Sequence, residues 1–180
     1  MKTIDELLSQ IANNTGATPP EPSVKEPTYK KEEKKTVKKQ ITGTRPYLTL
    51  ALAKEIIYCV EKGAENMGLN AVIAVVNADG RLVAFEAMDN SYLASISAAQ
   101  DKAYTAAALK MPTEKALAES RGGIFDGLSN GNGILLLGGG NPLFINGELV
   151  GAVGVSGGTK EQDIELSMLG VRYIEERLSL

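Results

Sequence analysis

The residues best suited to chemistry in this sequence are few, because two common catalytic and ligating side chains are missing or scarce. The chain of 180 residues contains no histidine and a single cysteine, Cys59. Without histidine, catalytic Ser-His-Asp and Cys-His groups, HExxH zinc sites and proximal-histidine haem ligation are excluded. A single cysteine excludes an internal disulfide, a CxxC redox motif and a cysteine-rich metal site. Any chemistry must therefore use carboxylates, lysine, tyrosine, threonine, the one thiol, backbone amides or a bound cofactor.

Two glycine clusters are candidate ligand-binding loops. The run 138–140 lies between two predicted strands, and the run 156–159 joins a strand to a predicted helix, where free N–H groups would suit a carboxylate or phosphate. Neither run matches a GxGxxG or P-loop motif, and a turn that needs a positive φ explains either one alone. Two clusters on adjacent strands nevertheless favour a pocket. Its candidate residues are Gly138, Gly139, Gly140, Ser156, Gly157, Gly158 and Thr159.

An alanine-rich helix carries the other candidate ligand-binding residues. Lys102 and Thr105 are three residues apart and share a helix face, whereas Tyr104 points elsewhere. This pair could line a site, or it could form the solvent-exposed edge of the helix. Cys59 occupies an apolar helical position, which favours an inert buried thiol over a nucleophile. No pair of carboxylates is placed for acid–base catalysis, and solvation is expected for Asp126, Glu161, Asp163 and Glu165.

The elements that must position these residues follow from hydrophobic periodicity and turn signals. Asp79-Gly80 and Asn146-Gly147 predict tight hairpins, and Thr159 with Gln162 predicts a capping box. Hairpins imply antiparallel pairing, so we predict an α+β fold with a five-stranded antiparallel sheet and flanking helices, in the order α-β-β-α-(α)-β-β-β-α. The predicted helices are 49–67, 92–109, 113–119 and 160 to about 177, and the predicted strands are 71–76, 82–87, 134–137, 143–145 and 149–155.

The first 44 residues differ in composition from the rest. Residues 1–16 predict a short amphipathic helix whose apolar stripe is Ile4, Leu7, Leu8 and Ile11. Residues 17–44 are rich in Pro, Lys and Glu and predict a disordered linker, so the domain is expected at 45–180. The helix suits docking into a groove of another protein, and the alternative is that it folds back onto its own domain. A net charge of −3 and the lack of a long apolar run predict neither a nucleic-acid nor a membrane partner.

Three motifs place the domain in a known family. They are K-A-Y-T-A at 102–106, G-G-G-N-P at 138–142 and G-A-V-G-V-S-G-G-T-K-E-Q-D at 151–163. With LTLALAKEII at 48–57, they closely resemble the GlcG/HbpS family, which includes haem-binding proteins and the C-terminal domain of PduO-type microcompartment proteins. The resemblance covers about residues 47–178 and implies a profilin-like sandwich that assembles into homo-oligomers, often octamers.

The resemblance also suggests ligands and a cellular setting. It implies haem, and in some members a corrinoid such as cobalamin, with Thr105 or Cys59 as the iron contact, since this chain has Arg81 where the family often has histidine. The N-terminal helix is similar to encapsulation peptides that bind a microcompartment shell protein or other cargo. We therefore expect a cytoplasmic, microcompartment-associated, oligomeric tetrapyrrole-binding accessory protein rather than an enzyme. The alternatives are a small-molecule enzyme using Lys102 and the glycine-rich pocket, or a structural cargo protein without a ligand.

Overall fold

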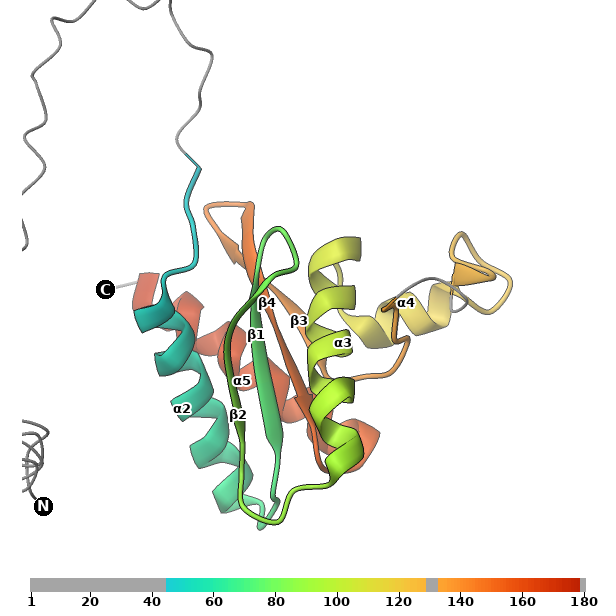
Figure 1. The fold of residues 1–180 in the computed structure, drawn as a ribbon. Coiled ribbons are helices and arrows are strands. Elements are labelled where there is room, and N and C mark those ends of the chain that lie inside the picture. The colour runs from blue at the N-terminus through green and yellow to red at the C-terminus, as the bar shows by residue number, and fades with distance from the viewer. Residues whose placement is uncertain (1–44, 129–132, 179–180) are drawn as a thin grey trace, which may run out of the picture. The chain divides into compact units, whose positions relative to one another are not determined.

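The structure, a computed structural model, describes residues 45–128 and 133–178. The predicted helix at 1–16 and the predicted linker at 17–44 lie outside the described residues. Helices and strands occur in one α+β domain (Figure 1). The helices are α2 (Leu50–Asn66), α3 (Leu93–Leu109), α4 (Thr113–Glu119) and α5 (Lys160–Leu178), and the strands are β1 (Val72–Asn77), β2 (Leu82–Ala87), β3 (Gly140–Ile145) and β4 (Glu148–Ser156).

The strands form one antiparallel sheet with the order β2-β1-β4-β3. Both predicted hairpins are confirmed, since β1 pairs with β2 and β3 pairs with β4. Asn146 and Gly147 have φ angles of 52° and 80°, the left-handed conformation that the second hairpin requires. Gly80 likewise has a φ of 74° in the first hairpin. These two local signals therefore fix which strands are neighbours at each end of the sheet.

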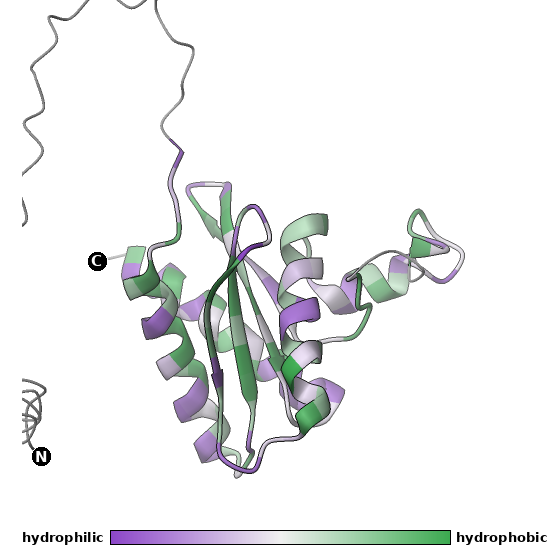
Figure 2. Cartoon of the chain, viewed as in Figure 1, coloured by the Kyte–Doolittle hydropathy of each residue, from purple (hydrophilic) through white to green (hydrophobic). Residues whose placement is uncertain are grey.

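The two faces of the sheet pack against different helices. On one face, α2 and α5 bury large aliphatic side chains of the strands, including Ile73, Val75 and Val153. On the other face, the alanines of α3 cover Val72 and Ala74. Figure 2 shows β1, in the middle of the sheet, mainly in hydrophobic colours and hydrophilic residues on the outer side of α2. No helix within the described ranges is long and apolar enough to cross a membrane.

The close approach of α3 to the sheet depends on small residues. A Cβ atom built on Gly154 of β4 would collide with the backbone oxygen of Ala99 and lie 2.5 Å from the backbone nitrogen of Ala103. Glycine is therefore required at this position of β4, opposite Ala99 and Ala103 of α3. This contact brings Lys102, which lies next to Ala103, directly over the end of β4.

The expected fifth strand is wrong. Residues 134–137 form no strand, and within the described residues the sheet has four strands. The Leu135 N–H donates to the Thr105 side chain, and the Leu137 N–H donates to the Leu135 carbonyl, so this backbone bonds to α3 and to itself. The edge strand is instead β3, which begins at Gly140 and includes Pro142, a residue that an edge strand tolerates. The profilin-like character of the sandwich stays a prediction.

Candidate functional site

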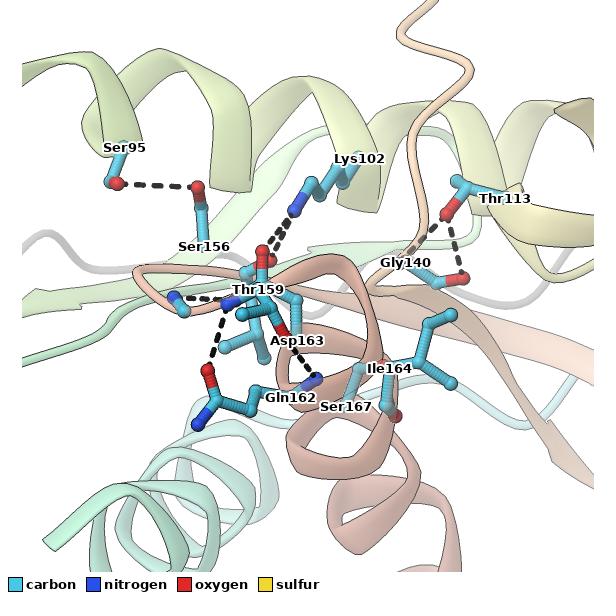
Figure 3. A network of polar contacts seen from close by, with 12 residues as sticks. Ser95, Lys102, Thr113, Gly140, Ser156, Thr159, Gln162, Asp163, Ile164 and Ser167 are labelled. Carbon is cyan, nitrogen blue, oxygen red and sulfur yellow. Dashed lines mark hydrogen bonds and ion pairs between the residues drawn. The ribbon is translucent and has the colours of Figure 1, made fainter. Parts of the chain in front are cut away.

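A buried ion pair joins α3 to α5 at the end of β4. The Lys102 ammonium donates to the Asp163 carboxylate at 2.6 Å and to the Val155 carbonyl at 2.8 Å (Figure 3). Lys102 has no solvent-exposed surface and Asp163 is 4% exposed. Burial lowers the pKa of the Lys102 ammonium, and the hydrogen bond and charge of Asp163 oppose that shift. The aspartate therefore serves as the counter-ion that a buried lysine requires.

The N-terminus of α5 already holds an anion. The second Asp163 oxygen accepts a hydrogen bond from the Gly158 N–H at 2.9 Å. The predicted capping box is confirmed, because the Thr159 N–H donates to the Gln162 side chain at 2.8 Å and the Gln162 N–H donates to the Thr159 hydroxyl at 3.3 Å. The glycine turn thus presents N–H groups as the sequence suggests, and side chains of the same turn and helix accept the hydrogen bonds.

The glycine run 138–140 closes over the same ion pair, so the two glycine clusters converge within one subunit. A Cβ atom on Gly139, whose φ is 110°, would lie 2.7 Å from the Asp163 Cβ and 3.1 Å from the Lys102 ammonium. One on Gly140 would collide with the Lys102 carbonyl oxygen. The Gly140 N–H also donates to the Thr113 hydroxyl at 2.9 Å. These glycines permit close packing around the lysine.

Three other predicted site residues differ in their access to solvent. Thr105 is fully buried; its hydroxyl accepts from the Leu135 N–H at 2.8 Å and donates to the Gly133 carbonyl at 3.5 Å. Ser156 is 9% exposed and donates to the Ser95 hydroxyl at 3.2 Å. Tyr104 is 38% exposed and lines a surface pocket of about 380 Å³ beside Asp101, with its ring against Gly80. Of these three, only Tyr104 has substantial exposed surface.

Cys59 lies on the other face of the sheet, in α2, and is partly exposed rather than buried. It lines an open, mainly apolar pocket of about 560 Å³ with Tyr58, Tyr173, Lys54, Glu55 and Lys62. The Tyr173 hydroxyl donates to Glu55 at 2.9 Å, and the Lys62 ammonium lies 5.4 Å from the centre of the Tyr58 ring. Burial, and then the charge of Glu176, raise the pKa of the Cys59 thiol. We call this group the Cys59 pocket.

The sequence missed Asp163, which was expected to be solvated. A usable signal exists, because Lys102 shares its helix face with Ala99, Ala103 and Ala106, all of which are fully buried. A lone charge on such a face predicts a buried carboxylate partner elsewhere in the chain. Within residues 45–128 and 133–178, no three His, Cys, Asp or Glu side chains are grouped to hold a metal ion.

The chain is similar in sequence to known proteins. The chain is 39% identical over 119 residues to the "Uncharacterized 15.0 kDa protein in dhaT-dhaS intergenic region" of Citrobacter freundii, covering 64% of this chain and 84% of that protein. It is 35% identical over 117 residues to the corrinoid adenosyltransferase PduO of the same species, covering 63% of this chain and 35% of PduO. The chain therefore spans about a third of the length of that enzyme.

A solved structure and a family model extend the comparison. The crystal structure of a PduOC:heme complex superposes with a TM-score of 0.68 at 26% identity, over 71% of this chain and 94% of that one. The family model described as "Haem degrading protein HbpS-like" matches residues 48–172, which include both glycine clusters, Lys102 and Cys59. From its sequence, its sheet and its helices, the chain belongs to the HbpS-like family.

Proposed function

We propose that this chain is a homo-oligomeric tetrapyrrole-binding accessory protein of a bacterial microcompartment, with haem or a corrinoid as its ligand. The observation that carries the proposal is the match to nearly the whole of a domain whose crystal structure contains haem. The similarity to a corrinoid adenosyltransferase supports a corrinoid as the second ligand. An octameric assembly and a cytoplasmic location inside the compartment are parts of the same proposal.

The Cys59 pocket is the described surface that best fits a tetrapyrrole. Its sulfur is a ligand that iron accepts, and the rings of Tyr58 and Tyr173 supply flat apolar surface for a macrocycle. Lys54 and Lys62 would form ion pairs with the carboxylates of the ligand. Bound haem would supply a redox-active iron, and a corrinoid a redox-active cobalt. The protein residues would bind the macrocycle, orient it and partly exclude water from the metal.

Thr105 fits less well as the iron contact. Its hydroxyl is buried and bonded on both sides, to the backbone of Gly133 and of Leu135. Iron could approach it only after the segment at 133–135 moved away from α3. The Lys102 ammonium is hydrogen-bonded to Asp163 and fully buried. Both features weigh against an enzyme in which that amine attacks a substrate. The binding role is therefore the proposal that we retain.

A hemin titration of the full chain, followed by absorbance with cobalamin in parallel, tests this assignment. We expect a saturable, stoichiometric Soret change that weakens at least about tenfold in Cys59→Ala, which corresponds to about 1.4 kcal/mol of binding free energy. Lys62→Gln should weaken binding less, and Lys160→Gln is its matched control because Lys160 is also exposed and ion-paired. A flat response to both ligands would refute the tetrapyrrole role, and an unchanged response in Cys59→Ala would move the contact to another site.

The microcompartment part of the proposal depends on residues 1–16. Fused to a fluorescent reporter and co-expressed with a shell, this segment should give shell-associated foci. Leu7→Glu should disperse them because the charge interrupts the apolar stripe. Gln10→Glu, with the same charge added off the stripe, should keep the foci. Diffuse fluorescence of the unaltered fusion would contradict the docking role without affecting the ligand.

A further inference from the structure

The outer edge of β2 is an unpaired strand edge. Within the described residues, β2 pairs only with β1 and ends the sheet on that side. Its exposed residues include Leu82, at 49%. The opposite edge, β3, has Pro142 as a residue that blocks further pairing, whereas β2 has no proline. An open strand with little charge is a template for pairing with another chain.

The hydrogen bonds to β1 show which backbone groups of β2 point outward. The Asn77 N–H donates to the Arg81 carbonyl at 2.8 Å, and the Met88 N–H donates to the Ala71 carbonyl at 3.0 Å. Arg81 and Met88 therefore face β1. Inward and outward groups alternate along an antiparallel strand, so Leu82 and Phe85 direct their N–H and C=O groups away from the sheet.

A bulge also puts the side chains of Leu82 and Phe85 on one face. The β1–β2 register shifts between Val75 and Val76, which leaves Val83 as the extra residue. As a result Leu82 lies opposite Val76 and Phe85 lies opposite Ala74, both on the face covered by α3. Leu82 and Phe85 thus share two features. Their backbone N–H and C=O groups point away from the sheet, and their side chains lie on the same face.

The charges at the two ends of β2 select the partner. Arg81 precedes the strand and Glu86 lies near its end, and both are exposed without an ion-pair partner among the described side chains. Antiparallel pairing of two identical strands brings the basic end of each against the acidic end of the other. A parallel arrangement would instead place like charges together, which is unfavourable.

We propose that β2 pairs antiparallel with β2 of a second copy of this chain, around a two-fold axis between Val83 and Ala84. This register places Leu82 opposite Phe85 of the partner copy, and Arg81 opposite its Glu86. Both contacts occur twice by symmetry. The pairing joins the two sheets into one and forms an apolar cluster on the α3 face. The inference rests on the homo-oligomer of the proposed function and names one of its interfaces.

A charge exchange in the full chain tests this pairing. We expect Arg81→Glu and Glu86→Arg each to weaken self-association about tenfold, because each creates two like-charge contacts, and the double variant to recover it. Native mass spectrometry and light scattering over a range of concentrations measure the association. Recovery in the double variant separates pairing from general destabilisation, which the double variant would not reverse.

A second comparison uses apolar residues at the two sheet edges. Leu82→Lys should lower the assembly mass, whereas Phe144→Lys, which changes a residue 41% exposed on β3, should leave it unchanged. An oligomer unaffected by both Leu82→Lys and the single charge reversals would overturn this interface and leave the proposed assembly standing. A wild-type chain that stays monomeric at every concentration would overturn both. Hemin binding measured on the same samples tests the ligand separately.

Discussion

Lys102 is unusual because it is a charged side chain that is completely buried. A lysine with no exposed surface keeps its charge only where other groups accept hydrogen bonds from its ammonium, and here the Asp163 carboxylate and the Val155 carbonyl do so. The contact joins residues that are 61 positions apart in the sequence. It fixes the start of α5 against α3.

Removing the charge of Lys102 alone should therefore be costly. We expect Lys102→Met to lower the free energy of unfolding by about 3–5 kcal/mol, because Asp163 would remain buried without its counter-ion. Urea denaturation followed by circular dichroism measures this. The double variant Lys102→Met/Asp163→Asn should recover at least about 2 kcal/mol, since the amide oxygen can still accept from Gly158. A loss below about 1 kcal/mol in the single variant would contradict the role given to the pair.

The Cys59 thiol should react slowly at neutral pH. Burial and Glu176 raise its pKa above the ordinary 9.0, so the thiolate fraction is small and increases only as the pH rises through that raised value. The rate of alkylation by iodoacetamide, measured against pH, should have its midpoint above 9.0. Glu176→Gln should move the midpoint down toward 9.0, because it removes the neighbouring negative charge. A wild-type midpoint at or below 9.0 would contradict this environment.

Among the elements, the contact of α3 with β4 tolerates the least change. Gly154→Ala adds a Cβ atom against the backbone of Ala99 and Ala103, and we expect it to destabilise the fold by at least about 2 kcal/mol. Gly68→Ala is the control, because its Cβ would meet no atom within 4 Å. It should cost only about 1–2 kcal/mol, from its φ of 66°. Thermal and urea unfolding measure both variants, and equal losses would show that the close approach is unimportant.

The sequence predicts well those elements that local chemistry determines. Asn146-Gly147 specifies a hairpin through its own backbone preferences, and Thr159 with Gln162 specifies a helix start, whatever surrounds them. The run 134–137 is different. Its apolar residues suit a strand, but a strand also needs a free neighbouring edge, and hydrogen bonds of this backbone to Thr105 take its place. Hydrophobic periodicity does not show whether this backbone will pair with a strand or form a hydrogen bond to Thr105.

The sequence singles out Lys102 and the glycine clusters of the candidate site, but not Asp163 or its hydrogen bonds. The sequence favours a pocket between the two glycine clusters, and in the structure Gly139 and Gly158 both lie against the Lys102–Asp163 pair. It does not indicate that Asp163 fills the position expected for a ligand, because a carboxylate in the first turn of a helix is usually solvated. The spatial separation of Cys59 from Thr105 follows from which face of the sheet each helix covers, and this is a tertiary property.

At the scale of the whole molecule, the sheet separates two kinds of surface. The Lys102–Asp163 pair joins α3 to α5 at the end of β4. Leu82 and Phe85 lie on the α3 face at the β2 edge, whereas the face of α2 and α5 carries the Cys59 pocket. The proposed pairing through β2 and the proposed ligand site at Cys59 therefore involve different parts of the domain. Changes to one should leave the other intact, which the paired measurements of mass and hemin absorbance examine directly.

The internal carboxylate at the start of α5 has a consequence for chemical rescue. Asp163→Ala would leave the Lys102 ammonium and the Gly158 N–H facing a gap about the size of a small carboxylate. We expect this variant to unfold at a lower temperature and to regain stability as formate is added, since a ligand bound only by the folded state stabilises it. Chloride should restore less, and the wild-type chain should not respond. Formate from solution would then replace the carboxylate that the Asp163 side chain supplies in the wild-type protein.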